Sequence, residues 1–294
     1  MKARLRTYFE THFSSQTVRT YLRVCLQFMD WCDKENINPA TANIDELYRY
    51  KGDLIDQGYA EGTIRQNLQV LKYFYRAIKR KDNPALLVKH AKLERTKPQF
   101  LLSKDQLEEV YLSIETRGLT QRRNKCLMGV LIFQGLKLGE IEALKLTDLD
   151  PTNWTIRIAK TSKTNSRTIQ LDIVQIKDMM DYVYEYRPKL LDERGCDSDN
   201  LFFSLGTGHQ LNNAINGMLR YVKALNPQVK SSMQIRQSRM SVWVSEYGLR
   251  KAQYLSGVRY ASSMLRYQTK DIESLKQKLE IVHPMQGMVN KGYL

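Results

Sequence analysis

The chain has 294 residues, of which 42% are hydrophobic and 26% charged, a composition typical of a globular protein with room for two domains. Its 46 lysines and arginines exceed its 31 aspartates and glutamates, so the formal net charge is +15 and nucleic acid is the expected partner. It has no apolar run of about eighteen residues and no signal-peptide core at its N-terminus, which argues against a membrane protein and favours a cytoplasmic, nucleoid-associated one.

In the first ninety residues, apolar side chains recur at helical spacing over 17–32, 45–57 and 63–80, and a short fourth helix is expected at 84–92. Burial of these stripes against one another predicts a compact helical bundle with basic polar faces. Such faces suit contacts to the DNA backbone, although each charge taken alone is at least as consistent with a solvated helix face. The candidates are Arg19, Arg23, Arg65, Lys72, Arg76 and Lys79.

Residues 89–100 lose this periodicity and are basic. They predict an interdomain linker, placed at 93–102, between a first domain at 1–92 and a second at 103–294. The linker region extends the expected DNA-binding surface. Its candidates are Lys92, Arg95 and Lys97.

The second half begins with a capping-box pattern, Ser103 and Gln106, that predicts a helix over 104–114. An apolar run over 124–133 predicts a core helix, which breaks before Gly135.

Two β-prone runs, 155–158 and 168–171, flank a polar turn at 160–166 and predict a hairpin. The segments that follow are expected to supply scaffold. They are a helix at 173–186, a strand-like run at 201–203 and a helix at 212–225.

The later part of the chain predicts a buried helix over 235–244 and a second helical piece over 249–255 that ends at Gly257. Arg236 lies beside apolar positions of the first helix, where a guanidinium needs a partner or a ligand. Tyr267 follows a short polar and aromatic run, so its phenol is expected near a turn rather than deep in a core. The alternative is a buried helix pair with an ion-paired arginine and an unremarked tyrosine.

This later stretch resembles the second half of the catalytic domain of the tyrosine recombinase (phage integrase) family. That pattern is His-x-x-Arg, then a Gly-His pair, then a tyrosine nine residues further on. Here Met233-Gln234-Ile235-Arg236 matches the first part, Gly257-Val258 the pair, and Tyr267 lies nine residues beyond Val258. Met233 and Val258 therefore stand in place of the two histidines. This last part of the chain resembles an integrase branch found on bacterial mobile elements. The residues that carry this resemblance are Val258-Arg259-Tyr260, Ser262-Ser263, Tyr267 and His283-Pro284.

The run Gly-Leu-Lys-Leu-Gly-Glu-Ile-Glu-Ala-Leu at 135–144, with Asp148-Leu149-Asp150 after it, resembles the family's first box. Lys137 stands where the family has its first catalytic arginine. Glu140 stands where the family has a glutamate whose role is structural. Lys137 as a plain helix-start lysine is equally consistent, because an ammonium cannot clamp two phosphate oxygens in a planar fork. On the hairpin, Lys160 takes the place of the family's general acid, with Lys163 as a substitute and as a further candidate for DNA contact.

The resemblance implies a mainly α fold with a small β-sheet or hairpin. In it, an N-terminal helical core-binding (SAM-like) domain precedes a C-terminal α+β catalytic domain. It implies a site-specific DNA recombinase, an integrase or transposase of a mobile element, that cuts and rejoins DNA in topoisomerase-like steps through a 3′-phosphotyrosine link. Tyr267 is then the nucleophile, Arg236 stabilises the phosphate and Lys160 is the general acid, with no cofactor.

The implied partners are double-stranded DNA with paired inverted core sites and further copies of the chain, as a tetramer on DNA. A partner recombinase or host factors are further candidates. An apolar stripe at 272–281 predicts a terminal helix, and the family's exchange of C-terminal segments favours exchange of this tail between protomers.

The substitutions at Lys137, Met233 and Val258 keep a second hypothesis open, a catalytically weak DNA-binding accessory or regulator with the same fold. An unrelated basic helical protein is a third.

The cysteines and histidines are dispersed, with no Cys-x-x-Cys pair. This spacing predicts neither a zinc site nor a disulfide framework, and we expect reduced, mostly buried thiols. The residues concerned are Cys25, Cys32, Cys126, Cys196, His12, His90, His209 and His283.

Overall fold

The computed structural model describes residues 1–89, 98, 100–162, 164–205 and 211–267. The chain forms two compact units, Met1–Arg95 and Thr96–Leu294, each with a hydrophobic core of its own. It is mainly helical with one small antiparallel sheet, as predicted. None of the helices within the described ranges combines the length and apolarity needed to span a bilayer.

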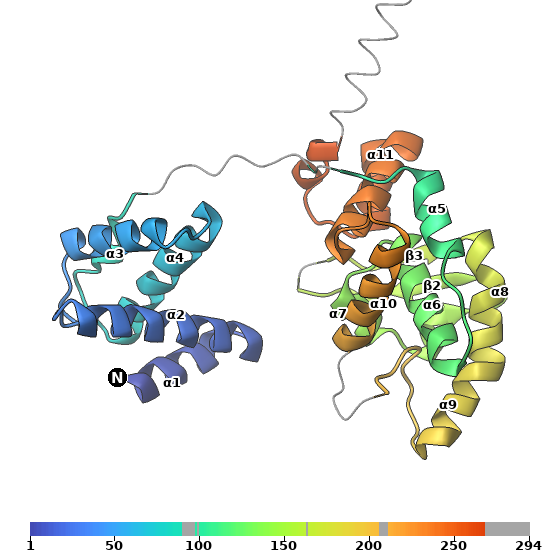
Figure 1. Ribbon diagram of the computed structural model, residues 1–294, viewed down its shortest axis with the longest axis horizontal. Coiled ribbons are helices and arrows are strands. Elements are labelled where there is room, and N and C mark those ends of the chain that lie inside the picture. The colour runs from blue at the N-terminus through green and yellow to red at the C-terminus, as the bar shows by residue number, and fades with distance from the viewer. Residues whose placement is uncertain (90–97, 99, 163, 206–210, 268–294) are drawn as a thin grey trace, which may run out of the picture. The chain divides into compact units, whose positions relative to one another are not determined.

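The first unit is a helical bundle (Figure 1). The periodicity of apolar residues predicted its second, third and fourth helices to within a turn. It missed the first helix, because Leu5 and Phe9 are that helix's buried residues and are too few to make a periodic stripe. The helices are α1 (Lys2–His12), α2 (Ser15–Lys34), α3 (Ile44–Asp56) and α4 (Glu61–Ala77).

The helix expected at 84–92 is wrong in its length. The structure has one 3₁₀ turn, η1 (Pro84–Leu86), which Asn83 caps by accepting a hydrogen bond from the amide of Ala85 at 3.2 Å. Leu86 and Leu87 are 53% and 64% exposed, so burial of these two side chains does not extend the turn. Residues 90–92 lie outside the described ranges.

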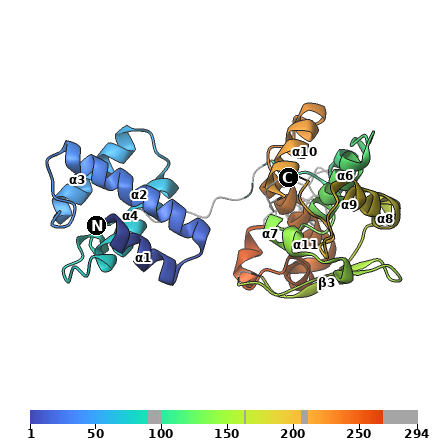
Figure 2. The same ribbon diagram turned by 90° about the horizontal axis from the view of Figure 1, so that it is seen from below.

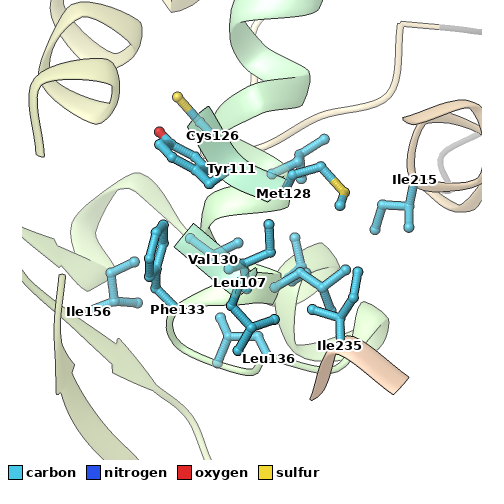
Figure 3. Close-up of a cluster of buried hydrophobic side chains, with 14 of the residues drawn as sticks. Leu107, Tyr111, Cys126, Met128, Val130, Phe133, Leu136, Ile156, Ile215 and Ile235 are labelled. Atoms are coloured by element: carbon cyan, nitrogen blue, oxygen red, sulfur yellow. The ribbon is translucent and has the colours of Figure 1, made fainter. Parts of the chain in front are cut away.

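The second unit is built around α6 (Leu119–Ile132), the core helix predicted from the apolar run. Before it, α5 (Lys104–Leu112) begins with the predicted capping box. Ser103 Oγ accepts from the Gln106 amide at 3.2 Å, and Gln106 Oε1 accepts from the Ser103 amide at 2.8 Å. Figure 3 shows side chains of α6 meeting those of neighbouring elements in the core. The labelled residues are Leu107, Tyr111, Cys126, Met128, Val130, Phe133, Leu136, Ile156, Ile215 and Ile235.

The predicted hairpin is present as β2 (Thr155–Ile158) and β3 (Arg167–Gln170), which pair antiparallel with Ile156 opposite Ile169. A third strand, β1 (Leu149–Asp150), adds to β2, and its two residues were too short a run to predict. The helix predicted at 212–225 is present as α10 (Asn212–Leu225). In the view of Figure 2, β3 lies at one edge of the unit and α10 at the opposite edge.

The strand predicted at 201–203 is wrong. The amide of Leu201 donates to the carbonyl of Leu144 at 2.8 Å, and Lys145 and Asn200 form an isolated bridge, but no strand follows in this segment. Leu201 and Phe202 are at most 1% exposed, so burial in the core explains the apolar run without a sheet.

The helix predicted at 173–186 is α8 (Ile173–Asp181), which continues through a π-helical turn, Tyr182–Tyr186, into α9 (Arg187–Arg194). Pro188 lacks the amide that would donate to Tyr184 in a regular helix, so the change of winding falls just before it. The short elements between β1 and the core helix are α7 (Leu138–Ala143) and η2 (Leu146–Asp148).

The last long helix, α11 (Ser232–Ser256), is broken at Gly248, as the two predicted helical pieces require. Gly248 has φ 74° and ψ 172°, and Gly257 ends the helix with φ 67°. Two 3₁₀ turns follow, η4 (Ala261–Ser263) and η5 (Leu265–Tyr267).

We expect Gly248→Ala to lower the free energy of unfolding of the second unit by about 1–3 kcal/mol, because side-chain-bearing residues rarely adopt this backbone conformation. The matched control is Gly217→Ala in the middle of α10, where an added Cβ meets no atom within 4 Å. It should raise stability by about 0.5–1 kcal/mol, since alanine favours a helix interior. Urea denaturation followed by tryptophan fluorescence measures both, and equal effects would contradict the prediction.

Candidate active site

Three buried charged side chains from different elements meet in the second unit. Glu140 lies on α7, Arg167 on β3 and Arg236 on α11, and their exposed fractions are 4%, 3% and 5%. Glu140 and Arg167 form a bidentate pair, with Oε1–Nη1 at 2.8 Å and Oε2–Nη2 at 3.0 Å. Nη1 of Arg236 lies 3.9 Å from Oε2 of Glu140. Two guanidiniums therefore share one carboxylate, which leaves a net positive charge in this cluster.

The pKa values of the cluster reflect this imbalance. Burial opposes ionisation of Glu140, but the hydrogen bonds and charge of Arg167 outweigh it, so the pKa of Glu140 lies below its usual value. Burial lowers the pKa of Arg236 to about 10, and the carboxylate of Glu140 offsets this effect only in part. A bound anion would supply the missing counter-charge.

Arg236 also links the turn after α6 to the C-terminal end of α11. Its Nη1 donates to the carbonyl of Gly135, in the turn after α6, and its Nη2 donates to the carbonyl of Ser256 at 2.8 Å, at the end of α11. Gly135 has φ 54°, a conformation that favours glycine, so the break predicted after the core helix presents this carbonyl to the guanidinium.

A cavity of about 200 Å³ lies beside Arg236. Lys137, at the start of α7, and Met233, on α11, both line it, so the structure places three of the residues predicted from the family pattern around one cavity. Met233 is 61% exposed and offers no hydrogen-bond donor. The polar lining residues that the sequence analysis did not single out are Asn212, Asn216 and Ser232.

Tyr267 lies on the 3₁₀ turn η5, as expected, but the expectation that it lies away from a core is wrong. Its side chain is 6% exposed, because η4 and η5 fold against α11 and bury Met264 and Tyr267 together. Burial raises the pKa of Tyr267, while the charges of Arg266 and Arg236 act in the opposite direction. The Arg266 guanidinium lies 5.6 Å from the centre of the Tyr267 ring.

The remaining site candidates lie outside this cavity. Lys160 is exposed and lies two residues beyond the end of β2, and neither Lys160 nor Tyr267 is among the lining residues of the described cavity. Val258 is half-buried and packs against the core, where it offers no donor. Lys163 lies outside the described residues.

Arg167 is the residue that the sequence analysis missed. The alternation of β3 could have found it, because Arg167 shares the buried face with Ile169. Its Nε donates to the carbonyl of Leu255 at 2.9 Å, so it also ties the hairpin to α11. A Cβ at Gly257 would lie 2.4 Å from Arg167 Nη1, so this arrangement requires glycine there.

The basic residues predicted to contact DNA in the first unit lie on or next to α2 and α4. All are exposed except Lys72, which is half-buried, and Arg76 stacks over the ring of Tyr73 at 5.6 Å. Their contact with DNA stays a prediction. Lys92, Arg95, Lys97 and the predicted tail helix at 272–281 lie outside the described ranges.

Cys25, Cys32 and Cys126 are buried and Cys196 is exposed, and all are free thiols. Among the residues whose structure is described, no three metal-ligating side chains come together.

Residues 1–84 match the model of the phage integrase N-terminal SAM-like domain. Over 290 residues the chain is 26% identical to a tyrosine recombinase XerC of Pelotomaculum thermopropionicum, and the match covers 94% of each protein.

Two solved structures have a similar fold. One is the XerH site-specific recombinase bound to its difH substrate in a pre-cleavage complex, with a TM-score of 0.67, 16% identity and coverage of 88% of this chain and 79% of that one. The other is the Tn1549 transposon integrase in complex with circular intermediate DNA, with a TM-score of 0.60, 14% identity and coverage of 90% and 94%. The chain therefore has the two-domain architecture of these proteins.

We expect Glu140→Gln to lower the free energy of unfolding of the second unit by about 3–5 kcal/mol, because it leaves two buried guanidiniums without a counter-charge. The control is Glu185→Gln, which removes an exposed ion pair with Lys189 at 2.8 Å and should change stability by less than about 0.5 kcal/mol. Denaturant unfolding measures both, and a small loss for Glu140→Gln would contradict the structural role of the shared carboxylate.

Proposed function

The chain belongs to the tyrosine recombinase family, and from this premise we propose that it is a site-specific DNA strand transferase with Tyr267 as its nucleophile. The observation that carries the proposal is the cavity lined by Arg236 and Lys137, which lies next to an undercompensated buried positive charge. Such a site is suited to a phosphodiester, which brings one negative charge and oxygen acceptors.

The proposed reaction is a transesterification. The Tyr267 oxygen forms a bond to phosphorus and the bond from phosphorus to the 5′ oxygen breaks, which leaves a 3′-phosphotyrosine link and a 5′ hydroxyl. Lys160 gives a proton to the departing oxygen, and the proton of the phenol passes to solvent. Attack by the 5′ hydroxyl of a second strand reverses these steps and rejoins the DNA. Because the ester bond is kept in the covalent link, the reaction needs no nucleotide cofactor.

Each residue of the cluster has a role in this scheme. Arg236 donates to the phosphoryl oxygens as charge develops, and Lys137, which lines the same cavity, adds a point charge. Glu140 and Arg167 touch no substrate in this scheme and hold Arg236 and the hairpin in place.

The proposed substrate is double-stranded DNA with paired inverted core sites, bound by a tetramer of the chain with its tail exchanged between protomers. Residues 1–92 would be the core-binding domain, 93–102 a basic linker and 103–294 the catalytic domain, in a cytoplasmic, nucleoid-associated protein. The likeness to a transposon integrase supports the assignment to a mobile element, with transposition as the outcome and host factors or a partner recombinase as further participants. The exposed basic residues on α2 and α4 support backbone contacts by the first unit.

A second function, that of a DNA-binding accessory with little cleavage activity, is favoured by two observations. Met233 and Val258 offer no donors where the family pattern has histidines, and the Tyr267 side chain is 6% exposed. Loss of one fixed donor costs on the order of 10²- to 10³-fold in rate.

The two functions are separated by a nicked suicide DNA substrate made from the ends of the chain's own element. We expect the wild-type protein to form a covalent protein–DNA adduct on a denaturing gel and Tyr267→Phe to form none. The control is Tyr260→Phe, which alters a tyrosine that is 70% exposed and lies seven residues earlier, and its adduct should equal that of the wild type. Specific DNA binding without any adduct would favour the accessory role, and absence of both would contradict both functions.

We expect Met233→His to raise the single-turnover cleavage rate by on the order of 10²-fold, because it adds a donor to the cavity beside Arg236. Met233 is 61% exposed, so the change should leave stability unaltered. The control is Met180→His on α8, an exposed methionine that does not line this cavity, and it should leave the rate unchanged. An unchanged rate for Met233→His would mean that the phosphate does not bind at this cavity.

A further inference from the structure

The turn at 160–166, which carries Lys160, is hydrogen-bonded to residues 257–259, which precede Tyr267 in the chain. Nη2 of Arg259 donates to the carbonyl of Thr161 at 3.0 Å, and the amide of Asn165 donates to the carbonyl of Gly257 at 3.0 Å. Thr161 directly follows Lys160, so the arginine holds the backbone one residue away from the proposed general acid.

The turn itself is tightly built. The hydroxyls of Thr161 and Thr164 lie 2.7 Å apart, the Thr161 amide donates to the Thr164 carbonyl at 3.0 Å, and the Thr164 amide donates to the Thr161 hydroxyl at 3.0 Å. Thr164 is 0% exposed. These bonds join the two ends of the turn, so a contact at Thr161 positions the turn as a whole.

Other contacts hold the strands of the hairpin rather than this end of the turn. Arg167 donates to the Leu255 carbonyl at 2.9 Å, and the Tyr254 hydroxyl accepts from the Thr168 amide at 3.1 Å. The Arg259 side chain, by contrast, reaches Thr161, the residue beside Lys160. It directly follows Val258, which has no polar group of its own to offer at the histidine position.

We propose that Arg259 is a positioning residue for Lys160, which it holds in register with the phosphate that Tyr267 attacks. This inference rests on the proposed function. As the bond from the Tyr267 oxygen to phosphorus forms and the bond to the 5′ oxygen breaks, Lys160 must meet that departing oxygen to give it a proton, while the phenol proton passes to solvent. Arg259 touches none of these atoms and acts through the Thr161 carbonyl.

The test uses the full-length protein and the nicked suicide DNA in two forms, one with the natural 5′ oxygen at the cleaved bond and one with sulfur in its place. A thiolate leaves readily without a proton, so a defect confined to the general acid disappears on the sulfur substrate. We expect Arg259→Ala to slow adduct formation on the oxygen substrate by on the order of 10- to 100-fold and to match the wild type on the sulfur substrate. Arg259→Lys keeps a donor and should recover part of the rate on the oxygen substrate.

Two further variants make the outcome decisive. Arg250→Ala alters an exposed arginine of α11 and should match the wild type on both substrates. Lys160→Ala should be slow on oxygen and restored on sulfur. Equal loss of rate for Arg259→Ala on both substrates overturns the positioning role, and so does a Lys160→Ala variant that sulfur does not restore, while the Tyr267 adduct of the wild type remains. If the wild type forms no Tyr267-dependent adduct on either substrate, the proposed function fails and this inference fails with it.

Discussion

The carboxylate of Glu140 holds two buried guanidiniums and thereby joins three elements that are distant in the sequence. Arg167 brings β3 to it and Arg236 brings α11, while the amide of Lys137 donates to the same carboxylate at 2.9 Å. Removal of one partner of a buried charge pair costs far more than the pair contributes, because it strands the other charge away from water. The carboxylate of Glu140 thus links the hairpin to α11, and Arg167 and Arg236 add their own bonds to the carbonyls of Leu255, Gly135 and Ser256.

The burial of Tyr267 works against its proposed role as the nucleophile. A nucleophile must lose its proton, yet burial raises the pKa of this phenol and covers the side chain. The opposing influences are positive charges, Arg266 over the ring and Arg236 at the end of the cluster. A bound phosphate would neutralise part of that positive charge, so the guanidiniums serve the developing charge on the phosphoryl oxygens more than they serve the phenolate.

Much of the fold could be predicted from the sequence because the apolar residues of α2, α3, α4 and α10 repeat at helical spacing. A break between two helical pieces, after residue 244 and before residue 249, was also predicted, because the apolar pattern stops there and resumes. The depth of Tyr267 could not be predicted, since it depends on how two 3₁₀ turns pack on α11, and such turns have no periodicity. The segment 201–203 was misassigned for a related reason. An apolar run shows that a segment is buried but does not show whether its backbone pairs with a strand.

Three of the residues around the cavity were predictable from the family pattern, but the charge balance of the buried cluster was not. The family pattern indicated Lys137, Met233 and Arg236, which do line one cavity. It could not show that Arg236 shares its carboxylate with Arg167.

The charge balance of this cluster distinguishes the two functions considered for the chain. A buried arginine whose pKa falls to about 10 lowers the stability of the fold, and a neutral residue of similar size would often be more stable. Binding DNA by surface contacts needs no such group, because exposed lysines and arginines supply it. Met233, by contrast, is 61% exposed, so its identity has little effect on stability, whereas Val258 packs against the core as an apolar side chain. The site therefore keeps a charge that is costly to bury, and this favours the proposed strand transferase over a protein that only binds DNA.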